Sequence, residues 1–150
     1  MRALIQRVSS ASLRVNDRLI SSISKGLVVY LGVGKDDNDS DIDYLVKKLM
    51  QLRIFNDREG RMNLSVQDIN GEFLVVSQFT LHAKTKKGNR PSYIRAAEPE
   101  KAIFYYQTFL KDLAQKSNLN VETGVFGSHM VIDQNNDGPV SIWIDTKLKE

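Results

Sequence analysis

Hydroxyl and amide side chains gather in the segment Ser77-Gln78-Phe79-Thr80-Leu81, directly after the apolar run Phe73-Leu74-Val75-Val76. The run is typical of a β-strand, and the ends of strands are common places for chemistry. The loop that follows adds positive charge from Lys84, Lys86, Lys87 and Arg90. We therefore predict a site at the end of this strand that takes an anionic substrate.

Thr80 is the obvious nucleophile, but a threonine hydroxyl needs a base, and threonine nucleophiles usually use the free amino group of the same residue. Thr80 is internal, and the two histidines, His82 and His129, lie in no recognisable triad motif. A simpler interpretation has Ser77 and Thr80 bonding to local backbone at the strand end. In a third interpretation, backbone N–H groups donate to a developing oxyanion, which lowers a barrier by about 3 kcal/mol per donor.

Metal and nucleotide motifs receive little support. Two separated histidines, no cysteine and no His-Glu-x-x-His pattern offer no zinc site. Asp36-Asp37-Asn38-Asp39 lacks the glycine and glutamate of a calcium loop, and we interpret it as a solvated lead into a helix. Gly32-Val33-Gly34-Lys35 has the spacing of neither common phosphate motif and is interpreted as a tight turn. We expect no metal and no cofactor.

Two further motifs stay open to more than one interpretation. The cationic loop can grip RNA phosphates in a salt-sensitive way, with Tyr93 available to stack on a base, or it can simply be solvated. Gly138-Pro139 precedes an apolar run, where proline is tolerated as a turn residue. X-Pro bonds are also the ones for which the cis form is cheap, so the dipeptide can aim its carbonyls unusually.

The composition describes a chain of 150 residues, 41% hydrophobic, with a formal net charge of +3. This length and hydrophobic content fit one globular domain. The charge permits nucleic acid as a partner but falls below that of a dedicated binder. The absence of cysteine fits a reducing compartment. The chain opens on no signal-peptide pattern, and its longest apolar stretch is too short for a membrane helix, so we expect a soluble, cytoplasmic protein.

The amino-terminal half predicts strands and then a helix. Alternation from Ala3 to Leu19 indicates a strand, interrupted at Ser9-Ser10-Ala11-Ser12 and turning at Asn16-Asp17 into a partner strand. The continuous apolar run Leu27 to Leu31 indicates a central strand. Asp39 or Ser40 is the expected cap of a helix with apolar positions Ile42, Leu45, Leu49 and Leu52.

The carboxyl-terminal half predicts a helix and then strands. Pro99 is expected to start a helix whose apolar face carries Ile103, Tyr106, Phe109, Leu110 and Leu113. Three short strands should follow over Val121 to Phe126, Met130 to Ile132 and Val140 to Ile144, the last two separated by a turn at Asn135-Asn136-Asp137-Gly138. The whole chain, 1–150, is predicted to be a single mixed α/β domain with antiparallel-rich sheets and two main helices, layered α/β/β.

Four ordered motifs resemble one family. They are Ser77-Gln78-Phe79-Thr80-Leu81, Lys87-Gly88-Asn89-Arg90-Pro91-Ser92, Gly124-Val125-Phe126-Gly127-Ser128-His129-Met130 and Asn136-Asp137-Gly138-Pro139-Val140. With the opening Met1-Arg2-Ala3-Leu4-Ile5-Gln6-Arg7-Val8, they make the chain similar, essentially end to end, to the D-aminoacyl-tRNA deacylases, the D-tyrosyl-tRNA deacylase family. Ser141 departs from the family's common threonine but keeps a hydroxyl.

The resemblance implies a homodimeric enzyme that hydrolyses the ester joining a D-amino acid, or glycine, to the terminal ribose of tRNA. The segment from Ser77 would line the pocket floor, where the backbone of Phe79 and Thr80 and the side chain of Gln78 approach the aminoacyl-adenosine. In this family the RNA 2′-hydroxyl is held to assist the attacking water. The cations of the loop would then contact tRNA.

The resemblance also implies how the enzyme discriminates between D- and L-aminoacyl substrates. Gly138-Pro139, cis in the family, would enter the pocket of the partner subunit and fill the space that an L side chain needs. Arg7 would hold the dipeptide, and Phe126 and Met130 would lie near the pocket. Because enantiomers are equally hydrophobic, a rigid wall separates them better than affinity for the side chain does, and such a wall does not exclude glycine.

Two other functions remain as alternatives. A noncatalytic tRNA-binding or ribosome-associated module would explain the cationic loop equally well. A small-molecule hydrolase with Thr80 as covalent nucleophile would explain the polar strand end.

Overall fold

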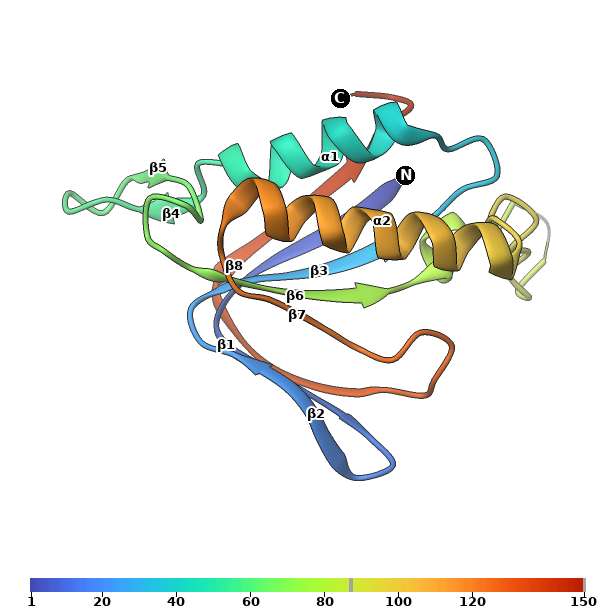
Figure 1. The fold of residues 1–150 in the computed structure, drawn as a ribbon, viewed down its shortest axis with the longest axis horizontal. Helices are drawn as coiled ribbons and strands as arrows, with labels where there is room; N and C mark the ends of the chain where they lie inside the picture. Colours follow the sequence, from blue (N-terminus) through green and yellow to red (C-terminus); the bar gives the residue numbers. More distant parts are fainter. Residues whose placement is uncertain (87, 150) are drawn as a thin grey trace.

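The computed structural model describes residues 1–86 and 88–149, and within these residues the chain forms eight strands, two α-helices and a short 3-10 helix (Figure 1). In chain order they are β1 (Arg2–Val15), β2 (Arg18–Ile23), β3 (Gly26–Gly32), α1 (Asp39–Gln51), β4 (Phe55–Asn56), β5 (Met62–Leu64), β6 (Glu72–Ser77), η1 (Phe79–His82), α2 (Pro99–Ser117), β7 (Val121–Thr123) and β8 (Val131–Asp145). In this part of the chain neither helix is long and apolar enough to cross a membrane.

The long strand β1 organises the main sheet. One of its edges pairs antiparallel with β3 and then with β2, and the other edge pairs antiparallel with β8 from Arg2 to Arg14. From β3 the sheet continues through β6 to β7 with parallel pairing. Strands β4 and β5 form a separate two-stranded sheet. The main sheet is therefore antiparallel around β1 and parallel towards β7.

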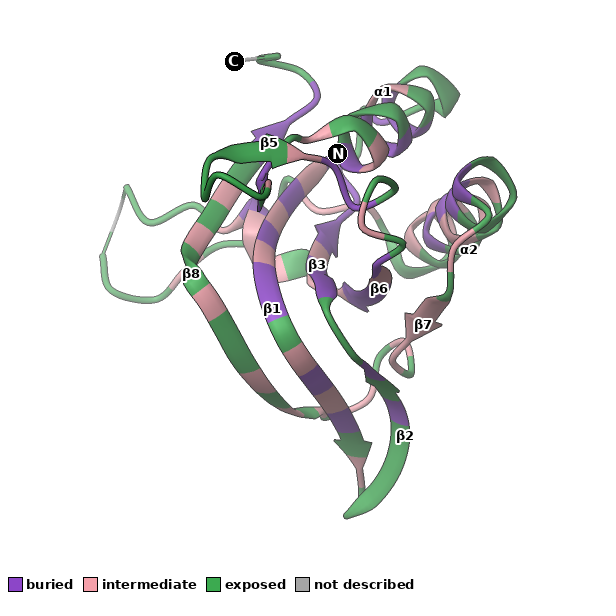
Figure 2. Ribbon diagram, turned by 90° about the vertical axis from the view of Figure 1, so that its left-hand side faces the viewer, coloured by how far each residue is buried: buried purple, intermediate pink, exposed green. Residues whose placement is uncertain are grey.

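Apolar cores lie on the two faces of this sheet. Helices α1 and α2 lie side by side over one face (Figure 1), and the larger core between them and the sheet includes Ile5, Val29, Leu45, Val75 and Phe109. The outer half of β1 curls away with β2 and β8 (Figure 2), and a second core inside the curl includes Val8, Leu13, Ile23 and Leu74. This arrangement confirms the predicted mixed α/β fold, with the main sheet packing under the helices on one face and curling around the second core on the other.

Strand β1 is continuous where an interruption was predicted. The serine-rich stretch Ser9-Ser10-Ala11-Ser12 stays in the strand because β8 pairs along it, with Ser10 opposite Asn135 and Ser12 opposite Asp133. The irregular alternation appears instead as shifts in register on either side of Val8. The predicted turn is confirmed, since Asn16 and Asp17 have φ values of 48° and 61° and lead directly into β2.

The carboxyl-terminal turn prediction is wrong. The stretch Asn135 to Gly138 lies inside one strand, β8, which joins the two short strands predicted at Met130 to Ile132 and Val140 to Ile144. Polar residues occur there because β8 is an edge strand with one exposed side, so turn-forming residue types do not need to turn. The full-length pairing partner, β1, lies more than a hundred residues away and leaves no local signal.

Both helices form where the apolar spacing predicts them. The cap of α1 is Asn38 rather than Asp39 or Ser40. Its side-chain oxygen accepts a hydrogen bond from the amide of Ser40, and the carboxylate of Asp41 accepts one from the amide of Asn38, as in a capping box. Helix α2 starts at Pro99 as predicted. Of its predicted apolar face, Ile103 stays 37% exposed.

Asp37 is buried, so the predicted solvated lead into the helix is wrong at this residue. Its carboxylate accepts hydrogen bonds from the amino group of Met1 at 2.7 Å and from the amide of Gly34 at 2.6 Å. The same amino group donates to the hydroxyl of Thr146. These partners come from opposite ends of the chain, and the cluster ties β1, β8 and the start of α1 together.

Asp41 belongs to the same cluster and has a lowered pKa. Burial raises the pKa of Asp41, but hydrogen bonds from the Lys147 ammonium, the Thr146 hydroxyl and the Asn38 amide outweigh burial and bring it below its ordinary value. Because the pKa is lower in the folded chain, this stabilisation is complete above the unfolded-chain pKa of about 4 and disappears as the pH falls through the folded-state pKa.

We expect Asp41→Asn to lower the free energy of unfolding by about 2 kcal/mol at pH 7 and by much less at pH 3, where the wild-type carboxylate is also losing its charge. Urea denaturation at the two pH values measures this. Asp43→Asn is a matched control on the same helix, because its ion pair with Lys116 is exposed, and it should change little at either pH. An equal loss for Asp41→Asn at both pH values would contradict the ionic origin.

Candidate active site

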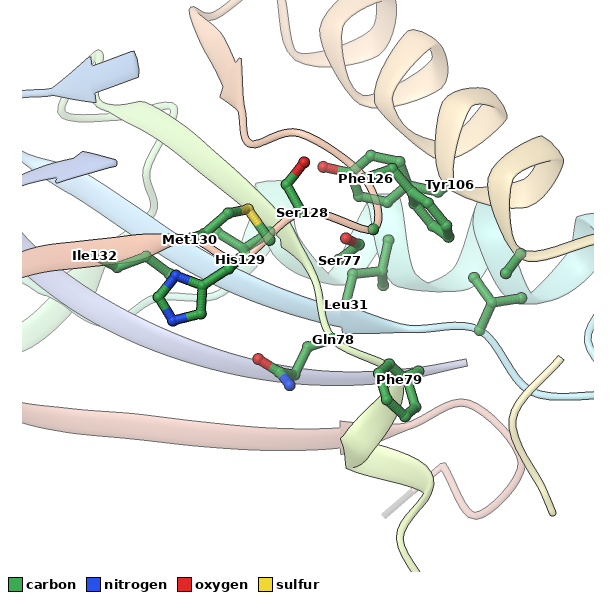
Figure 3. A pocket seen from close by; sticks show the side chains of 14 residues that line it. Leu31, Ser77, Gln78, Phe79, Tyr106, Phe126, Ser128, His129, Met130 and Ile132 are labelled. Carbon is green, nitrogen blue, oxygen red and sulfur yellow. The ribbon is translucent and has the colours of Figure 1, made fainter. Parts of the chain in front are cut away.

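A cavity of about 310 Å³ opens where the parallel strands β3 and β6 end (Figure 3). Helix α2 and the segment between β7 and β8 complete its walls. The polar side chains in its lining are Ser77, Gln78, Ser128 and His129, and the apolar ones include Leu31, Val76, Phe79, Tyr106, Phe126 and Met130. Ligands commonly bind at the carboxyl ends of parallel strands, where side chains from successive loops converge. The cavity is therefore the candidate site.

The predicted polar segment forms one wall of this cavity. Strand β6 ends at Ser77, and the amide of Gln78 donates to the carbonyl of Leu31 at 2.8 Å, which continues the β3–β6 pairing by one step. The chain then enters η1 at Phe79. Ser77, Gln78 and Phe79 line the cavity, whereas Thr80 is not among the described residues that do.

Two backbone amides at this strand end have no acceptor among the residues that the structure describes. Within η1 the amide of Leu81 donates to the carbonyl of Gln78, and the amide of Ala83 donates to the carbonyl of Thr80 at 2.9 Å. The amides of Phe79 and Thr80 have no acceptor among residues 1–86 and 88–149, as expected at the start of a helical turn. The hydroxyl of Thr80 accepts a hydrogen bond from the side-chain amide of Gln78. The segment thus presents backbone donors rather than a nucleophile paired with a base.

Aromatic and thioether side chains form the opposite wall. The Tyr106 ring on α2 lies 5.7 Å from the ring of Phe126, and its hydroxyl donates to the carbonyl of Val75 at 2.8 Å. Burial raises the pKa of Tyr106, so its hydroxyl keeps its proton. Gly124 leaves room for Met130, because a Cβ at this glycine would come 2.4 Å from the Met130 sulfur. Phe126 and Met130 thus lie in the cavity wall.

Gly138, Pro139 and Arg7 lie outside this cavity, since none of them is among its described lining residues. The peptide bond between Gly138 and Pro139 is cis, and both residues are exposed. Gly138 has a φ of +143°, and a Cβ there would come 2.7 Å from the amide nitrogen of Val140. The position therefore accommodates glycine and no larger residue without a shift of the backbone.

The buried guanidinium of Arg7 supports this part of β8. Its Nε donates to the carbonyl of Asp137 at 2.9 Å, and its Nη1 donates to the carbonyl of Ile54 at 2.6 Å. The other Nη would lie 3.2 Å from a Cβ at Gly138. Arg7 thus contacts the residue immediately before the dipeptide.

The cationic loop leaves the site after η1. Lys84, Lys86 and Arg90 are exposed, and Lys87 lies outside the described residues. Lys84 and Ser92 exchange backbone hydrogen bonds of 2.8 and 3.0 Å, which close the loop at its base. The loop is therefore anchored near η1, while the side chains of Lys84, Lys86 and Arg90 face solvent.

Sequence patterns missed several residues of the site. Tyr106 was predicted as an apolar position of α2, with no indication that its ring lines a cavity, and His129 and Ser128 enter through the motif that also carries Phe126. Arg2 was not singled out, yet it donates to the carbonyl of Leu81 at 2.9 Å and to the carboxylate of Asp145 at 2.8 Å. It thereby fixes η1 to the end of β8. In the part of the chain that the structure describes, no group of three metal-ligating side chains comes together.

His82 ends η1 as a packing residue. It is 6% exposed, and its ring fits against β3 because Gly32 and Gly34 have no side chains: a Cβ at either would come within 3.1 Å of the ring. Its Nε2 has no hydrogen-bond partner among the described residues. Burial lowers the pKa of His82, more than a hydrogen bond with the Gly32 backbone raises it, so the ring is neutral at pH 7.

Comparisons with known proteins identify relatives along the whole chain. Residues 4–145 match the family described as D-Tyr-tRNA(Tyr) deacylase. The D-aminoacyl-tRNA deacylase of Thermosipho melanesiensis is 51% identical over 147 residues, covering 98% of this chain and 98% of the relative. That of Flavobacterium psychrophilum is 52% identical over 150 residues and covers 100% of both chains.

Solved structures with the same fold are also found. The c-Myc DNA Unwinding Element Binding Protein matches with a TM-score of 0.91 at 38% identity, over 97% of this chain and 98% of that one. A probable eukaryotic D-amino acid tRNA deacylase matches with a TM-score of 0.83 at 18% identity, over 95% and 97% of the two chains, which shows a shared fold.

The fold and the cavity first define a class, that of mixed α/β proteins with a ligand site at the carboxyl ends of β3 and β6. The full-length matches then make the assignment specific. The chain belongs to the D-aminoacyl-tRNA deacylase family and is an enzyme of the hydrolase class.

We expect His82→Phe to flatten the pH dependence of stability below neutrality. The pKa of His82 is lower in the folded chain than the unfolded value of about 6.5, so the unfolded chain binds protons first and wild-type stability falls as the pH drops below that value. Phenylalanine fills similar space and cannot titrate.

Thermal melting between pH 5 and pH 8 measures this dependence. His129→Gln serves as the control, because His129 is exposed in the cavity lining, and this variant should keep the wild-type slope. If the melting temperature of His82→Phe changes with pH as steeply as that of the wild type, the buried ring of His82 does not cause the loss of stability below neutrality.

Proposed function

We propose that this chain hydrolyses the ester that joins a D-amino acid, or glycine, to the terminal ribose of tRNA. The observation that carries the proposal is the segment Ser77 to Thr80 in a chain of this family. It places two backbone amides that have no acceptor in the described part of the chain at the edge of a largely apolar cavity. The cavity accommodates the terminal aminoacyl-adenosine, and the exposed cations of the 84–90 loop attract the RNA backbone. Such a substrate places the enzyme in the cytoplasm.

Backbone donors and the RNA itself carry the chemistry in this proposal. The amides of Phe79 and Thr80 donate to the carbonyl oxygen of the ester as it becomes an oxyanion, and the Gln78 side chain helps to orient the substrate. Water forms a bond to the carbonyl carbon, the bond from that carbon to the ribose oxygen breaks, and the proton from water passes to the ribose oxygen. The neighbouring 2′-hydroxyl assists the water, so no protein base is needed.

In this proposal, a second copy of the chain discriminates between D and L substrates. Gly138-Pro139 is exposed and lies outside the cavity of its own chain, and Arg7 holds the adjacent Asp137, which leaves the dipeptide free to enter a partner's cavity in a homodimer. Its carbonyls there occupy the place of an L side chain. Exclusion of this kind separates enantiomers that apolar contact treats alike, whereas glycine projects no side chain and passes.

The alternative functions receive less support from the geometry. A Thr80 nucleophile requires a hydroxyl activated by a base, but the Thr80 hydroxyl accepts a hydrogen bond from the side-chain amide of Gln78, which is not a base. His82, the histidine next to it in sequence, is buried against two glycines rather than aimed at a hydroxyl. A purely RNA-binding module explains the loop but gives no reason for a cavity with free amides.

The direct test follows ester loss from D-Tyr-tRNA, L-Tyr-tRNA and glycyl-tRNA. We expect hydrolysis of the D and glycyl esters and survival of the L ester. Thr80→Ala should keep at least about a tenth of the wild-type rate, far from the roughly million-fold loss that removal of an essential nucleophile causes. Equal loss of the D and L esters, or loss of neither, would overturn the proposal, and a trapped acyl-enzyme in the wild type would establish Thr80 as the nucleophile.

A further inference from the structure

An exposed aromatic pair stands at the edge of the candidate active site. The rings of Phe79 and Tyr93 lie 5.0 Å apart, centre to centre, at an interplanar angle of 76°, and the two residues are 56% and 38% exposed. Phe79 also lines the cavity, so the pair is continuous with the site. A contiguous pair of exposed aromatic rings beside a binding cavity points to a ligand.

The backbone fixes Tyr93 in place. Ser92 pairs with Lys84 through two backbone hydrogen bonds, and the carbonyl of Tyr93 accepts from the amide of Ala96 at 2.9 Å in a turn. The next residues are held to the segment that follows β3, since the amide of Lys35 donates to the carbonyl of Arg95 at 3.1 Å. Tyr93 is thus anchored on both sides, and its ring does not depend on the exposed part of the loop.

Cationic residues lie on both sides of Tyr93 in the sequence. Lys84 and Arg90 flank Tyr93 on one side in the sequence and Arg95 on the other, and all three side chains are exposed. Exposed rings set among cations are the arrangement with which proteins hold single-stranded nucleic acid, because bases stack on the rings while phosphates meet the cations. A peptide would also accept the rings, but it would gain nothing from this charge unless it were acidic.

We propose that Phe79 and Tyr93 form a second nucleobase subsite, which stacks the unpaired nucleotide immediately before the terminal adenosine of the tRNA. The inference rests on the proposed function, because it assumes that the terminal aminoacyl-adenosine occupies the cavity. The RNA strand that leaves this cavity passes Phe79, and its next base stacks on the exposed edge-to-face pair of Phe79 and Tyr93. The subsite recognises a stacked base and its phosphate, and it does not read sequence.

The test compares substrates that differ by one nucleotide. D-Tyr esterified to adenosine reaches only the cavity, whereas D-Tyr esterified to the dinucleotide CpA reaches both subsites. We expect Tyr93→Ala to lower kcat/KM for the CpA ester by about ten-fold and to leave kcat/KM for the adenosine ester unchanged. Tyr93→Phe should keep the wild-type values for both, because stacking needs the ring and not the hydroxyl.

Ile94→Ala is the matched control. Ile94 follows Tyr93 directly and is more exposed, at 66%, so its truncation removes apolar surface beside the subsite without removing a ring. Both esters should be hydrolysed at wild-type rates by this variant. Equal losses in Ile94→Ala and Tyr93→Ala would overturn stacking as the cause.

Three further outcomes would overturn the subsite. The first is an unchanged kcat/KM of Tyr93→Ala for both esters. The second is an equal loss of kcat/KM for both esters, which would mean that Tyr93 only supports Phe79. The third is a changed sedimentation coefficient of Tyr93→Ala, which would make the pair a protein interface. Failure of the proposed function looks different, because wild-type protein would then hydrolyse neither ester. Fluorescence anisotropy with a labelled CCA trinucleotide still tests the subsite in that case, with about ten-fold weaker binding expected for Tyr93→Ala.

Discussion

Strand β1 is paired on both edges over nearly its whole length, and its antiparallel register with β8 fixes where the rest of the site lies. On one side β1 positions β3, whose parallel pairing with β6 brings the strand ends together at the cavity. On the other side it holds β8, and with it Gly138 and Pro139, outside that cavity. Arg7 lies on β1, and its buried guanidinium donates hydrogen bonds to the carbonyl of Asp137 on β8 and to the carbonyl of Ile54, just before β4.

This division has a chemical consequence. The cavity offers apolar walls and a few polar groups, and moving a side chain from water to apolar surroundings has the same free energy for both enantiomers of an amino acid. Discrimination between D and L substrates therefore needs a rigid obstacle on one side of the α-carbon. Gly138-Pro139, the segment proposed for that role, does not line the cavity of its own chain. Arg2 and His82 serve the other half of the site, because both fix η1 against the strands that carry it.

Much of the fold could be predicted because its signals are local. The turn at Asn16-Asp17, the start of α2 at Pro99 and the polar end of β6 at Ser77 depend on a few adjacent residues, and all three are confirmed. The errors concern distant partners. Asp37 looked solvated because its partner, the amino group of Met1, is far away in sequence, and Asn135 to Gly138 looked like a turn because the strand that pairs with it is β1.

The candidate site follows the same rule. The segment from Ser77 to Phe79 was found because an apolar run stops abruptly there, and Phe126 and Met130 were found through a motif. Tyr106 could not be assigned to the site, because a tyrosine at helical spacing looks like any core residue until the helix is placed over a strand end. Its contact with Phe126 is a property of the assembled layers and not of either segment.

A subunit-mixing experiment tests whether one chain supplies the cavity and another supplies the wall. Ser128→Trp fills the cavity but leaves Gly138-Pro139 intact, whereas Gly138→Ala disturbs the dipeptide but leaves the cavity open. Unfolded and refolded together in equal amounts, the two chains should regain D-selective hydrolysis of tyrosyl-tRNA at about one quarter of the wild-type activity, since half of the dimers contain one intact composite site. If the mixture behaves as the sum of the two separate variants, the wall acts within its own chain and the account is wrong.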